Sequence, residues 1–491
     1  MSTKFVSITF LLLIFGLPLG QVGWELSRGE PVQALDVISS MRADRMRQFE
    51  DELREESLIH TLVSPYYQWA LLSIGKGNEK AILGQDDWIF YRDDLDLITA
   101  PGFLQGQAWT AVDAAVDLRD QLASQGVELL FVPVPAKSMV ETRHISRWTA
   151  EVSAAFNSDG AEFLQELEER GVHTVDLSAL FAAARQGDTP LYLPRDTHWT
   201  PATMALAARE IAAQARRILG DGGATLSPAL EHEARPSTVH SPGDMIGMLR
   251  LPSPAQPFEP MRLDIEQVVT ADSGEFVSFD TEAQVLVMGD SFTGVFSDPR
   301  FGLGEHAGLG EHLAMQLGTS IDVIMSAGGA ARSVRESLAR RARGVTGKRL
   351  VIWQIAQREL IETDGRWDAV DLSSSVEVGE APVPSTARVL AEIVNVSRVP
   401  EGFEYDFCLA IYEYRVLEVR SGDIPGGPLW VAHIAIEDFV SGPGAEYAVG
   451  EKHTLQLEDI AGHHNLESTS FVDDTDSGRR IWFATALEAV D

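Results

Sequence analysis

The chain has 491 residues, 45% of them hydrophobic, which suits a packed core and is too apolar for a disordered chain. Its formal net charge of −34 argues against general nucleic-acid binding, because phosphate contacts need clustered Lys and Arg. The single cysteine, Cys408, excludes an intramolecular disulfide and a cysteine-rich zinc site.

The N-terminal segment is typical of an export signal. Residues 5–23 contain no charged side chain, and Lys4 precedes them. This pattern predicts a signal peptide or an uncleaved signal anchor within residues 1–28, with a buried helix as the alternative. Pro18 and Gly20 make a poor cleavage site, so we expect an anchor in the inner membrane and a periplasmic body.

The next segments, in chain order, indicate an α/β domain over residues 29–372. Residues 33–60 predict amphipathic helices, and residues 81–91 predict two short strands around a tight turn. From residue 107, predicted helices alternate with apolar strands. The helices are 108–125, 160–170 and 201–219, and the strands are 127–134, 172–177, 283–288, 321–325 and 349–355. Strands separated by helices favour a parallel sheet in a three-layer domain.

The C-terminal region has a different composition. Residues 373–386 resemble a linker. Five segments rich in Val, Ile, Tyr and Trp follow, separated by Gly- and Pro-containing turns: 388–397, 409–420, 429–439, 452–460 and 480–490. They predict a small all-β domain over residues 387–491, either a five-stranded barrel or a sandwich.

Three short motifs could carry chemistry. The first is Gly289-Asp290-Ser291 after the strand at 283–288, where a serine hydroxyl would emerge at the carboxyl end of the strand. An ordinary turn is the alternative, since Gly, Asp and Ser all favour turns.

The second motif is Asp196-Thr197-His198. In an extended segment, Asp196 and His198 could point the same way, and a serine nucleophile needs a base whose tautomer a carboxylate fixes. The alternative is that Asp196 caps the following helix while His198 packs against Trp199.

The third motif is Ser326-Ala327-Gly328-Gly329 after the strand at 321–325. Adjacent glycines would let a backbone N–H approach a reacting carbonyl, although a simple strand-to-helix turn would look the same.

Together with other segments, these motifs resemble the alginate O-acetyltransferase family of the AlgJ and AlgX type, whose domain is a variant of the SGNH hydrolase fold. The matching segments are LGQDDWIFY at 83–91, FVPVPAKSMVE at 131–141, DTHW at 196–199, SPGDMIGMLRLP at 241–252, VLVMGDSF at 285–292 and VIWQIAQREL at 351–360. The resemblance covers roughly residues 80–360. It departs from most SGNH enzymes in placing the Asp-x-His before the serine, and the usual SGNH asparagine motif is not recognisable.

The resemblance implies roles for individual residues. Ser291 would be the nucleophile, His198 the general base and Asp196 the partner that orients it. Gly328 or Gly329 falls where SGNH enzymes place an oxyanion donor. Neither a cofactor nor a metal is implied.

Three basic residues are candidates for substrate binding. Lys137 lies in a family-like segment, where it would touch substrate or tie down a loop. Arg358 would bind substrate or serve the structure. Arg332 begins a basic stretch, residues 332–349, with seven Lys and Arg against the single acid Glu336. This stretch would attract an anionic polysaccharide, form a solvated helix face or pair with the protein's own acids.

We therefore expect an exported serine O-acetyltransferase that modifies an extracytoplasmic polysaccharide, alginate-like or another exopolysaccharide, through an acetyl-serine intermediate. By family analogy, a membrane acyltransferase partner would deliver the acetyl groups. A carbohydrate acetyl esterase with the same three residues is one alternative, and a non-catalytic polysaccharide-binding or scaffold component of an export complex is another. The C-terminal domain would bind carbohydrate by analogy with AlgX-like proteins, although its acidic composition would repel an acidic polymer.

Overall fold

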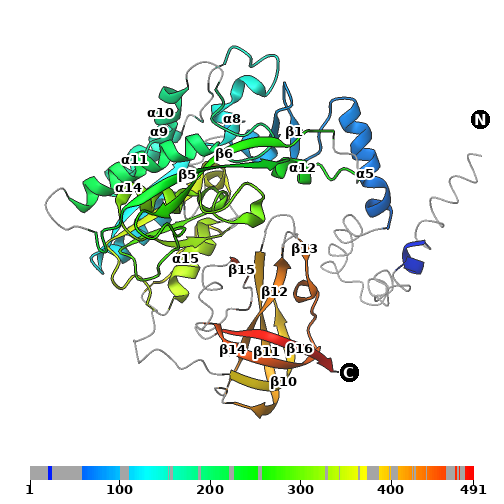
Figure 1. Ribbon diagram of the computed structural model, residues 1–491. Helices are drawn as coiled ribbons and strands as arrows, with labels where there is room; N and C mark the ends of the chain where they lie inside the picture. The colour runs from blue at the N-terminus through cyan, green and yellow to red at the C-terminus, as the bar shows by residue number, and fades with distance from the viewer. Residues whose placement is uncertain are drawn as a thin grey trace, which may run out of the picture. The chain divides into compact units, whose positions relative to one another are not determined.

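The structure of the protein is a computed structural model (Figure 1). The residues it describes are 20–24, 58–99, 110–152, 154, 157, 159–185, 189–220, 226–252, 257–326, 330–341, 343–362, 365–372, 386–397, 399, 407–422, 424, 427–437, 440–460, 470–472, 475 and 481–490.

Most of the N-terminal predictions lie outside the described residues, including residues 5–19 of the expected anchor and 33–57 of the expected helices. Among the helices that are described, none is both long and apolar enough to cross a bilayer. The first long described helix is α5 (Leu58–Ser73). The strands β1 (Ala81–Leu83) and β2 (Ile89–Tyr91) confirm the two short strands predicted around residues 84–88.

The α/β domain is built on a five-stranded parallel sheet with strand order β4-β3-β9-β7-β8. Its strands are β3 (Glu128–Val134), β4 (His173–Thr174), β7 (Val285–Gly289), β8 (Asp322–Met325) and β9 (Leu350–Ala356). Every residue of the central strands β7 and β9 is buried, which is why these segments appear in the sequence as unbroken apolar runs. The parallel three-layer fold predicted from the sequence is confirmed.

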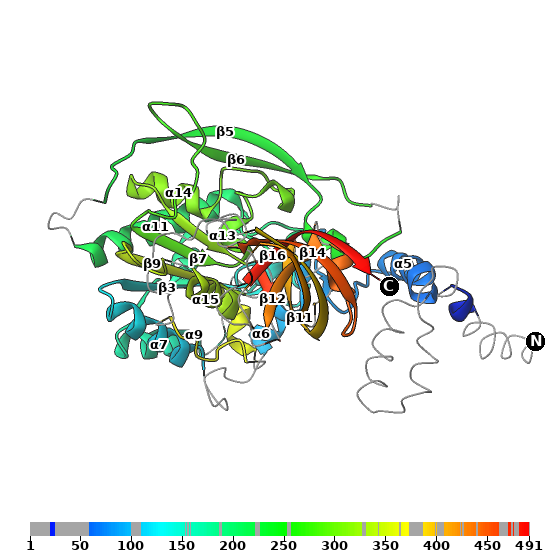
Figure 2. The ribbon, with the colours of Figure 1, turned by 90° about the horizontal axis from the view of Figure 1, so that it is seen from below.

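Helices cover both faces of the sheet (Figure 2). The long helix α11 (Pro201–Leu219) and α14 (Leu309–Leu317) lie on one face, and α7 (Ala111–Ala123), α9 (Gly160–Glu169) and α15 (Ala330–Arg340) lie on the other. Shorter helical segments complete the domain: α6 (Arg92–Thr99), α8 (Lys137–Val140), α10 (Leu177–Ala184), α12 (Asp244–Met248) and α13 (Ser291–Gly294).

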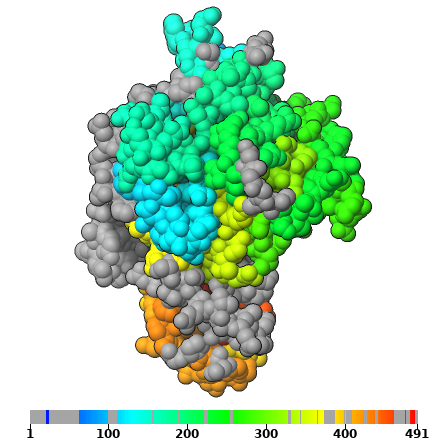
Figure 3. All heavy atoms as spheres, turned by 90° about the vertical axis from the view of Figure 1, so that its left-hand side faces the viewer, coloured from blue at the N-terminus to red at the C-terminus, as the bar shows by residue number. Residues whose placement is uncertain are grey.

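One antiparallel hairpin has no counterpart among the sequence predictions. Strands β5 (His232–Ser241) and β6 (Met261–Thr270) pair over their full length, from His232 opposite Thr270 to Ser241 opposite Met261. Most of β5 is at least partly exposed, and the green atoms of this region form one side of the face in Figure 3. The signal was weak because β5 contains Pro, Arg and two His instead of a clear apolar alternation.

The C-terminal domain, where the structure describes it, is a seven-stranded sheet in which five strands close a barrel: β10 (Thr386–Val396), β11 (Phe407–Ser421), β12 (Leu429–Glu437), β14 (Lys452–Asp459) and β16 (Ile481–Val490). These five pair around the ring in the order β10-β11-β12-β16-β14 and back to β10, and β12–β16 is the parallel pair of the ring. This is the strand order of the OB-fold. Two short strands add to it, β13 (Val440–Ser441) beside β12 and β15 (Ser470–Val472) beside β11. Of the two structures expected from the sequence, the barrel is the one that forms.

Candidate active site

Ser291 lies at the carboxyl end of the central strand β7, where the chain turns into α13. Asp290 caps this short helix by accepting a hydrogen bond from the Phe292 amide at 2.9 Å. Because Ser291 is the first helical residue, its own N–H has no acceptor within the helix. The serine is 8% exposed, so its hydroxyl sits almost entirely inside the protein.

Gln354 of the neighbouring strand β9 holds the turn before the serine. Its side-chain oxygen accepts from the Asp290 amide at 3.2 Å and from the Thr293 hydroxyl at 2.7 Å, while its amide donates to Asp290 Oδ1 at 2.9 Å. The second Asp290 oxygen accepts from the Ala356 amide at 2.6 Å. The turn is therefore bonded to the middle of the sheet.

Gly289 is needed here because of close contact. A Cβ at this position would lie 2.3 Å from Thr293 Oγ1 and 2.4 Å from Gln354 Oε1. Its φ is outside the left-handed region, so the turn does not depend on the conformational freedom of glycine.

His198 and Asp196 lie on a loop that precedes α11. The loop is closed by hydrogen bonds from the Leu193 amide to the His198 carbonyl at 3.0 Å and from the Thr200 amide to the Leu191 carbonyl at 2.9 Å. The helix is capped by the Thr200 side chain, so Asp196 does not serve as its cap. The capping interpretation of the Asp-x-His motif is therefore wrong.

The structure brings the serine, histidine and aspartate into one hydrogen-bonded line. His198 Nε2 lies 2.7 Å from Ser291 Oγ, and His198 Nδ1 lies 2.7 Å from Asp196 Oδ1. With the proton on Nδ1, the ring donates to Asp196 and accepts from the Ser291 hydroxyl. Residues 93 positions apart in the chain thus meet at hydrogen-bond distance.

His198 and Asp196 shift each other's pKa. Burial lowers the pKa of His198, but the charge and hydrogen bond of Asp196 outweigh it, so the pKa lies above its usual value. Burial raises the pKa of Asp196, but the histidine and the hydrogen bonds to this carboxylate prevail and hold its pKa below the usual value. The pair therefore favours an ionised aspartate beside a histidine that readily takes up a proton.

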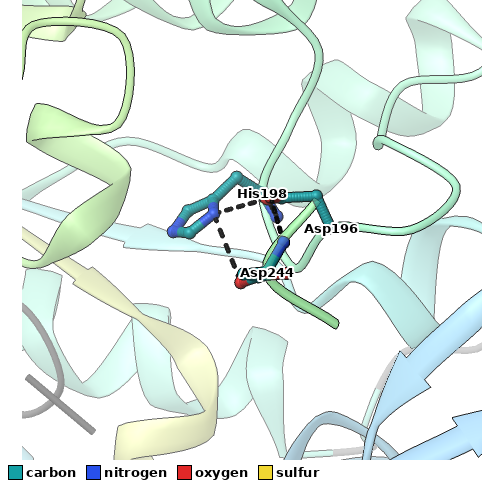
Figure 4. Close-up of side chains that lie close together, drawn as sticks. All are labelled: Asp196, His198 and Asp244. Carbon is teal, nitrogen blue, oxygen red and sulfur yellow. Dashed lines mark hydrogen bonds and ion pairs between the residues drawn. The ribbon is translucent and has the colours of Figure 1, made fainter. Parts of the chain in front are cut away.

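Asp244 is a second carboxylate beside the histidine, and the sequence analysis missed its role (Figure 4). Its Oδ2 lies 3.8 Å from His198 Nδ1. Burial, with Asp196 adding to the effect, raises the pKa of Asp244 to about 6. The signal in the sequence is the SPGDMIG segment at 241–247, which belongs to the family resemblance and contains this aspartate.

Asp196, His198 and Asp244 lie close enough together to hold a metal ion, with ligand atoms within 4.8 Å of one another. Within the described residues they are the one such group of His, Cys, Asp and Glu. The atoms are already engaged, however. Asp196 accepts from His198 and from the Asp244 amide, and Asp244 accepts from Thr197. An ion would have to replace these hydrogen bonds, so the arrangement fits a histidine–carboxylate pair better than a metal site.

Lys137 supports the loop that carries Asp196. Its side chain is completely buried, and its ammonium donates to the carbonyls of Ile89 at 2.5 Å, Pro194 at 2.9 Å and Asp196 at 2.9 Å. Burial lowers the pKa of Lys137 to about 8, against the opposing charges of the nearby carboxylates. All three of its donors are used, so of the two roles considered for this residue the structure favours tying down the loop.

Arg358 lies beside the Gly289-Asp290-Ser291 turn. Its guanidinium pairs with Asp94 at 3.1 Å and lies over the ring of Phe292, 5.7 Å from the centroid. Its role in substrate binding stays a prediction.

Arg332 is partnered by the protein itself, through Glu336 at 2.6 Å and Asp368 at 3.6 Å. Much of the basic stretch is similarly engaged: Arg341 and Lys348 share buried Asp322, Arg343 pairs with Glu282, and Arg335 donates to backbone carbonyls. Pairing with the protein's own groups therefore accounts for this stretch better than a surface for an anionic polymer. Gly328 and Gly329, the oxyanion candidates, lie outside the described residues.

Comparisons with known proteins bear on the same region. A family model described as "SGNH hydrolase-like domain, acetyltransferase AlgX" matches residues 81–357. A probable alginate O-acetylase AlgJ of Pseudomonas putida is 23% identical over 304 residues, covering 59% of this chain and 75% of that protein. The alginate biosynthesis protein AlgX of Pseudomonas aeruginosa is 30% identical over 144 residues, or 28% of each chain.

A solved structure of Pseudomonas aeruginosa AlgX aligns with a TM-score of 0.47 at 17% identity, covering 77% of this chain and 90% of that one. The family match includes both the Asp-x-His loop and the Gly-Asp-Ser turn.

Proposed function

Because this chain belongs to the AlgX family of SGNH hydrolase-like acetyltransferase domains, we propose that it is a serine-dependent O-acetyltransferase acting on an extracytoplasmic polysaccharide. The observation that carries the proposal is the line from Ser291 Oγ through His198 to Asp196, with both contacts at 2.7 Å. This arrangement suits acyl transfer because it both activates the hydroxyl and stabilises the cation that the histidine becomes.

In the first half-reaction, the Ser291 oxygen attacks the carbonyl carbon of an acetyl donor while its proton passes to His198. The tetrahedral intermediate then collapses, the bond from the carbonyl carbon to the leaving group breaks, and His198 returns the proton to that group. The Ser291 amide at the start of α13 is a suitable donor to the developing oxyanion. The product is an acetyl ester of Ser291.

In the second half-reaction, a sugar hydroxyl attacks the acetyl-serine and gives its proton to His198. The bond between the acetyl carbon and Ser291 Oγ breaks, and the serine oxygen recovers the proton. The reaction is thus an exchange of one ester for another, and Asp196 stabilises the imidazolium in both halves.

The acceptor class is proposed from the relatives, since the Pseudomonas proteins are named as an alginate O-acetylase and an alginate biosynthesis protein. We place the reaction outside the cytoplasm on the basis of the uncharged segment 5–23. A membrane acyltransferase partner, delivering acetyl groups across the inner membrane, belongs to the same proposal.

Mass spectrometry of the full-length chain after exposure to an activated acetyl ester tests the covalent step. We expect an adduct of about 42 Da on Ser291 that is absent from Ser291→Ala and His198→Ala. Wild-type protein that turns over the ester without ever carrying the adduct would contradict the acetyl-serine mechanism.

Transfer and hydrolysis are distinguished by their products with an oligosaccharide acceptor. A transferase yields the acetylated sugar, whereas an esterase with the same residues yields only free acetate. A Ser291→Ala strain that still fully acetylates its polymer would favour the scaffold role.

A further inference from the structure

Asp244 is bonded to the histidine loop at several points. Its carboxylate accepts from the Thr197 amide at 2.9 Å and from the Thr197 hydroxyl at 2.5 Å. The Asp244 backbone amide donates to Asp196 Oδ2 at 3.0 Å. Asp244 therefore holds both Asp196, the partner of His198, and Thr197, which lies between Asp196 and His198 in the chain.

The close contact between the backbone before Asp244 and the histidine loop depends on the preceding residue, Gly243. Gly243 has φ +89°, and a Cβ there would lie 2.1 Å from the Arg195 carbonyl oxygen. Only glycine combines this conformation with so close a contact. The Gly-Asp pair is thus fitted to the loop of residues 195–198 by its backbone as well as by its carboxylate.

Among the described residues, three charged side chains have the largest effects on the imidazole of His198. Asp196 and Asp244 face His198 and favour its protonated form, while Arg358 opposes them. Around Asp244, Asp196 disfavours the charged carboxylate, and His198 and Lys137 favour it. The Asp244 side chain is 29% exposed, against 5% for His198, so Asp244 is the more open to proton exchange with solvent.

We propose that Asp244 is a positioning residue for His198, which holds the Asp196–Thr197–His198 loop in place and adds a second negative charge beside the imidazole when it accepts the Ser291 proton. The inference rests on the proposed function, in which His198 is the general base. It assigns to the reaction a fourth side chain beyond the serine, histidine and aspartate.

The direction of the expected change in the pKa of His198 follows from the charge of Asp244. An ionised Asp244 stabilises the imidazolium, so removing its charge lowers the pKa of His198. The histidine then stays neutral, and able to act as a base, at a lower pH. Loss of the Asp244 charge also destabilises the imidazolium formed in the transition state. The rate on the plateau of the pH profile, where His198 is neutral, therefore falls.

The test follows sulfonylation of Ser291 by methanesulfonyl fluoride, in which the serine oxygen displaces fluoride and its proton passes to His198. Labelling rates are measured by intact mass between about pH 5 and 9, a range that includes the usual pKa of histidine. In Asp244→Asn, we expect the plateau rate to fall roughly tenfold and the acid limb to move down by roughly one pH unit. Asp244→Glu, which retains the charge, should return the limb toward its wild-type position.

Two controls separate this inference from a general loss of structure. Asp264→Asn removes an exposed carboxylate of β6 and should leave the profile unchanged. NMR titration of isotope-labelled histidine, with His198→Ala used to assign the signal, reports the His198 pKa without any need for turnover.

An Asp244→Asn profile that is merely scaled down, with its acid limb and the NMR pKa of His198 unmoved, would overturn the inference. So would a profile identical to the wild type. If wild-type Ser291 is not labelled at all, the serine mechanism of the proposed function fails, and the NMR comparison still decides whether Asp244 acts on His198.

Discussion

The two sides of the candidate active site are held by different means. Ser291 follows a fully buried central strand, so the hydrogen bonds of the sheet and Gln354 fix its position. His198 lies on a loop without regular secondary structure, and polar groups hold that loop, chiefly the buried Lys137 and the partly exposed Asp244. A buried strand thus places Ser291, whereas His198, which lies on a loop, is placed by hydrogen bonds from Lys137 and Asp244 to that loop.

The largest effect within this comparison is expected from the histidine side, with Asp196→Asn. An amide beside Nδ1 favours the tautomer with its proton on Nε2, so the ring can no longer accept the Ser291 proton, and the rate of ester turnover should fall on the order of 10⁴-fold.

The pH profile checks the same change. In the wild type, activity should fall as the pH drops through the raised pKa of His198, above the usual value of about 6.5. Residual activity in Asp196→Asn should persist to lower pH, because the pKa of His198 loses the support of the carboxylate. An unchanged profile would contradict the role given to Asp196.

Lys137→Met tests the hydrogen bonds that hold the histidine loop. It removes the ammonium that donates to the carbonyls of Ile89, Pro194 and Asp196, of which Pro194 keeps the Ile89 amide as a donor. We therefore expect the free energy of unfolding to drop by about 3 kcal/mol and the turnover of the remaining folded protein to fall. Urea denaturation and kcat measured on the same samples report the two effects.

Lys348→Met is the matched control. Lys348 is also buried, and it donates to the carbonyls of Thr281 and Ala283 and pairs with Asp322, away from the histidine loop. We expect a comparable loss of stability with unchanged kcat. Equal effects of the two substitutions on kcat would mean that Lys137 has no particular connection with the site.

Gly289→Ala tests the strand side. The added methyl group meets Thr293 and Gln354, so the turn must shift, and we expect a loss of about 2 kcal/mol in stability together with slower acylation of Ser291. Gly160→Ala, at a position where a Cβ meets nothing within 4 Å, should change neither quantity appreciably. Urea unfolding and the labelling rate of Ser291 are the measurements.

Arg332→Ala should have the smallest effect. Arg332 is half exposed and paired with Glu336 and Asp368, and surface ion pairs of this kind contribute about 0–1 kcal/mol. We expect the urea midpoint and the KM for a polysaccharide acceptor to remain near their wild-type values. A large rise in KM would restore Arg332 as a substrate-binding residue.

The sequence predicted the elements of the α/β domain well, because apolar runs such as 127–134 and 349–355 are long and their periodicity is strong. It also predicted that Ser291, His198 and Asp196 would meet, although no periodicity links residues so far apart. That expectation depended on motif order and family resemblance.

Other features could not be predicted from local patterns. The contacts of Asp244 with Asp196 and Thr197 span about fifty positions in the chain and are made by a loop, so neither helical nor strand spacing indicates them. Similarly, a lysine in an apolar segment does not reveal whether its ammonium group faces substrate or backbone carbonyls. Only the fold shows that Lys137 faces the latter.

The strand order of the sheet has a consequence for how the protein is made. β9 is the last strand of the sheet in the chain, yet it lies in the middle, between β3 and β7. A nascent chain that ends before Leu350 has two separate strand pairs, and the strand that joins them has yet to be synthesised. The histidine and serine halves of the site can therefore be joined through this sheet only once residues 350–356 take part, which makes their union a late event of folding.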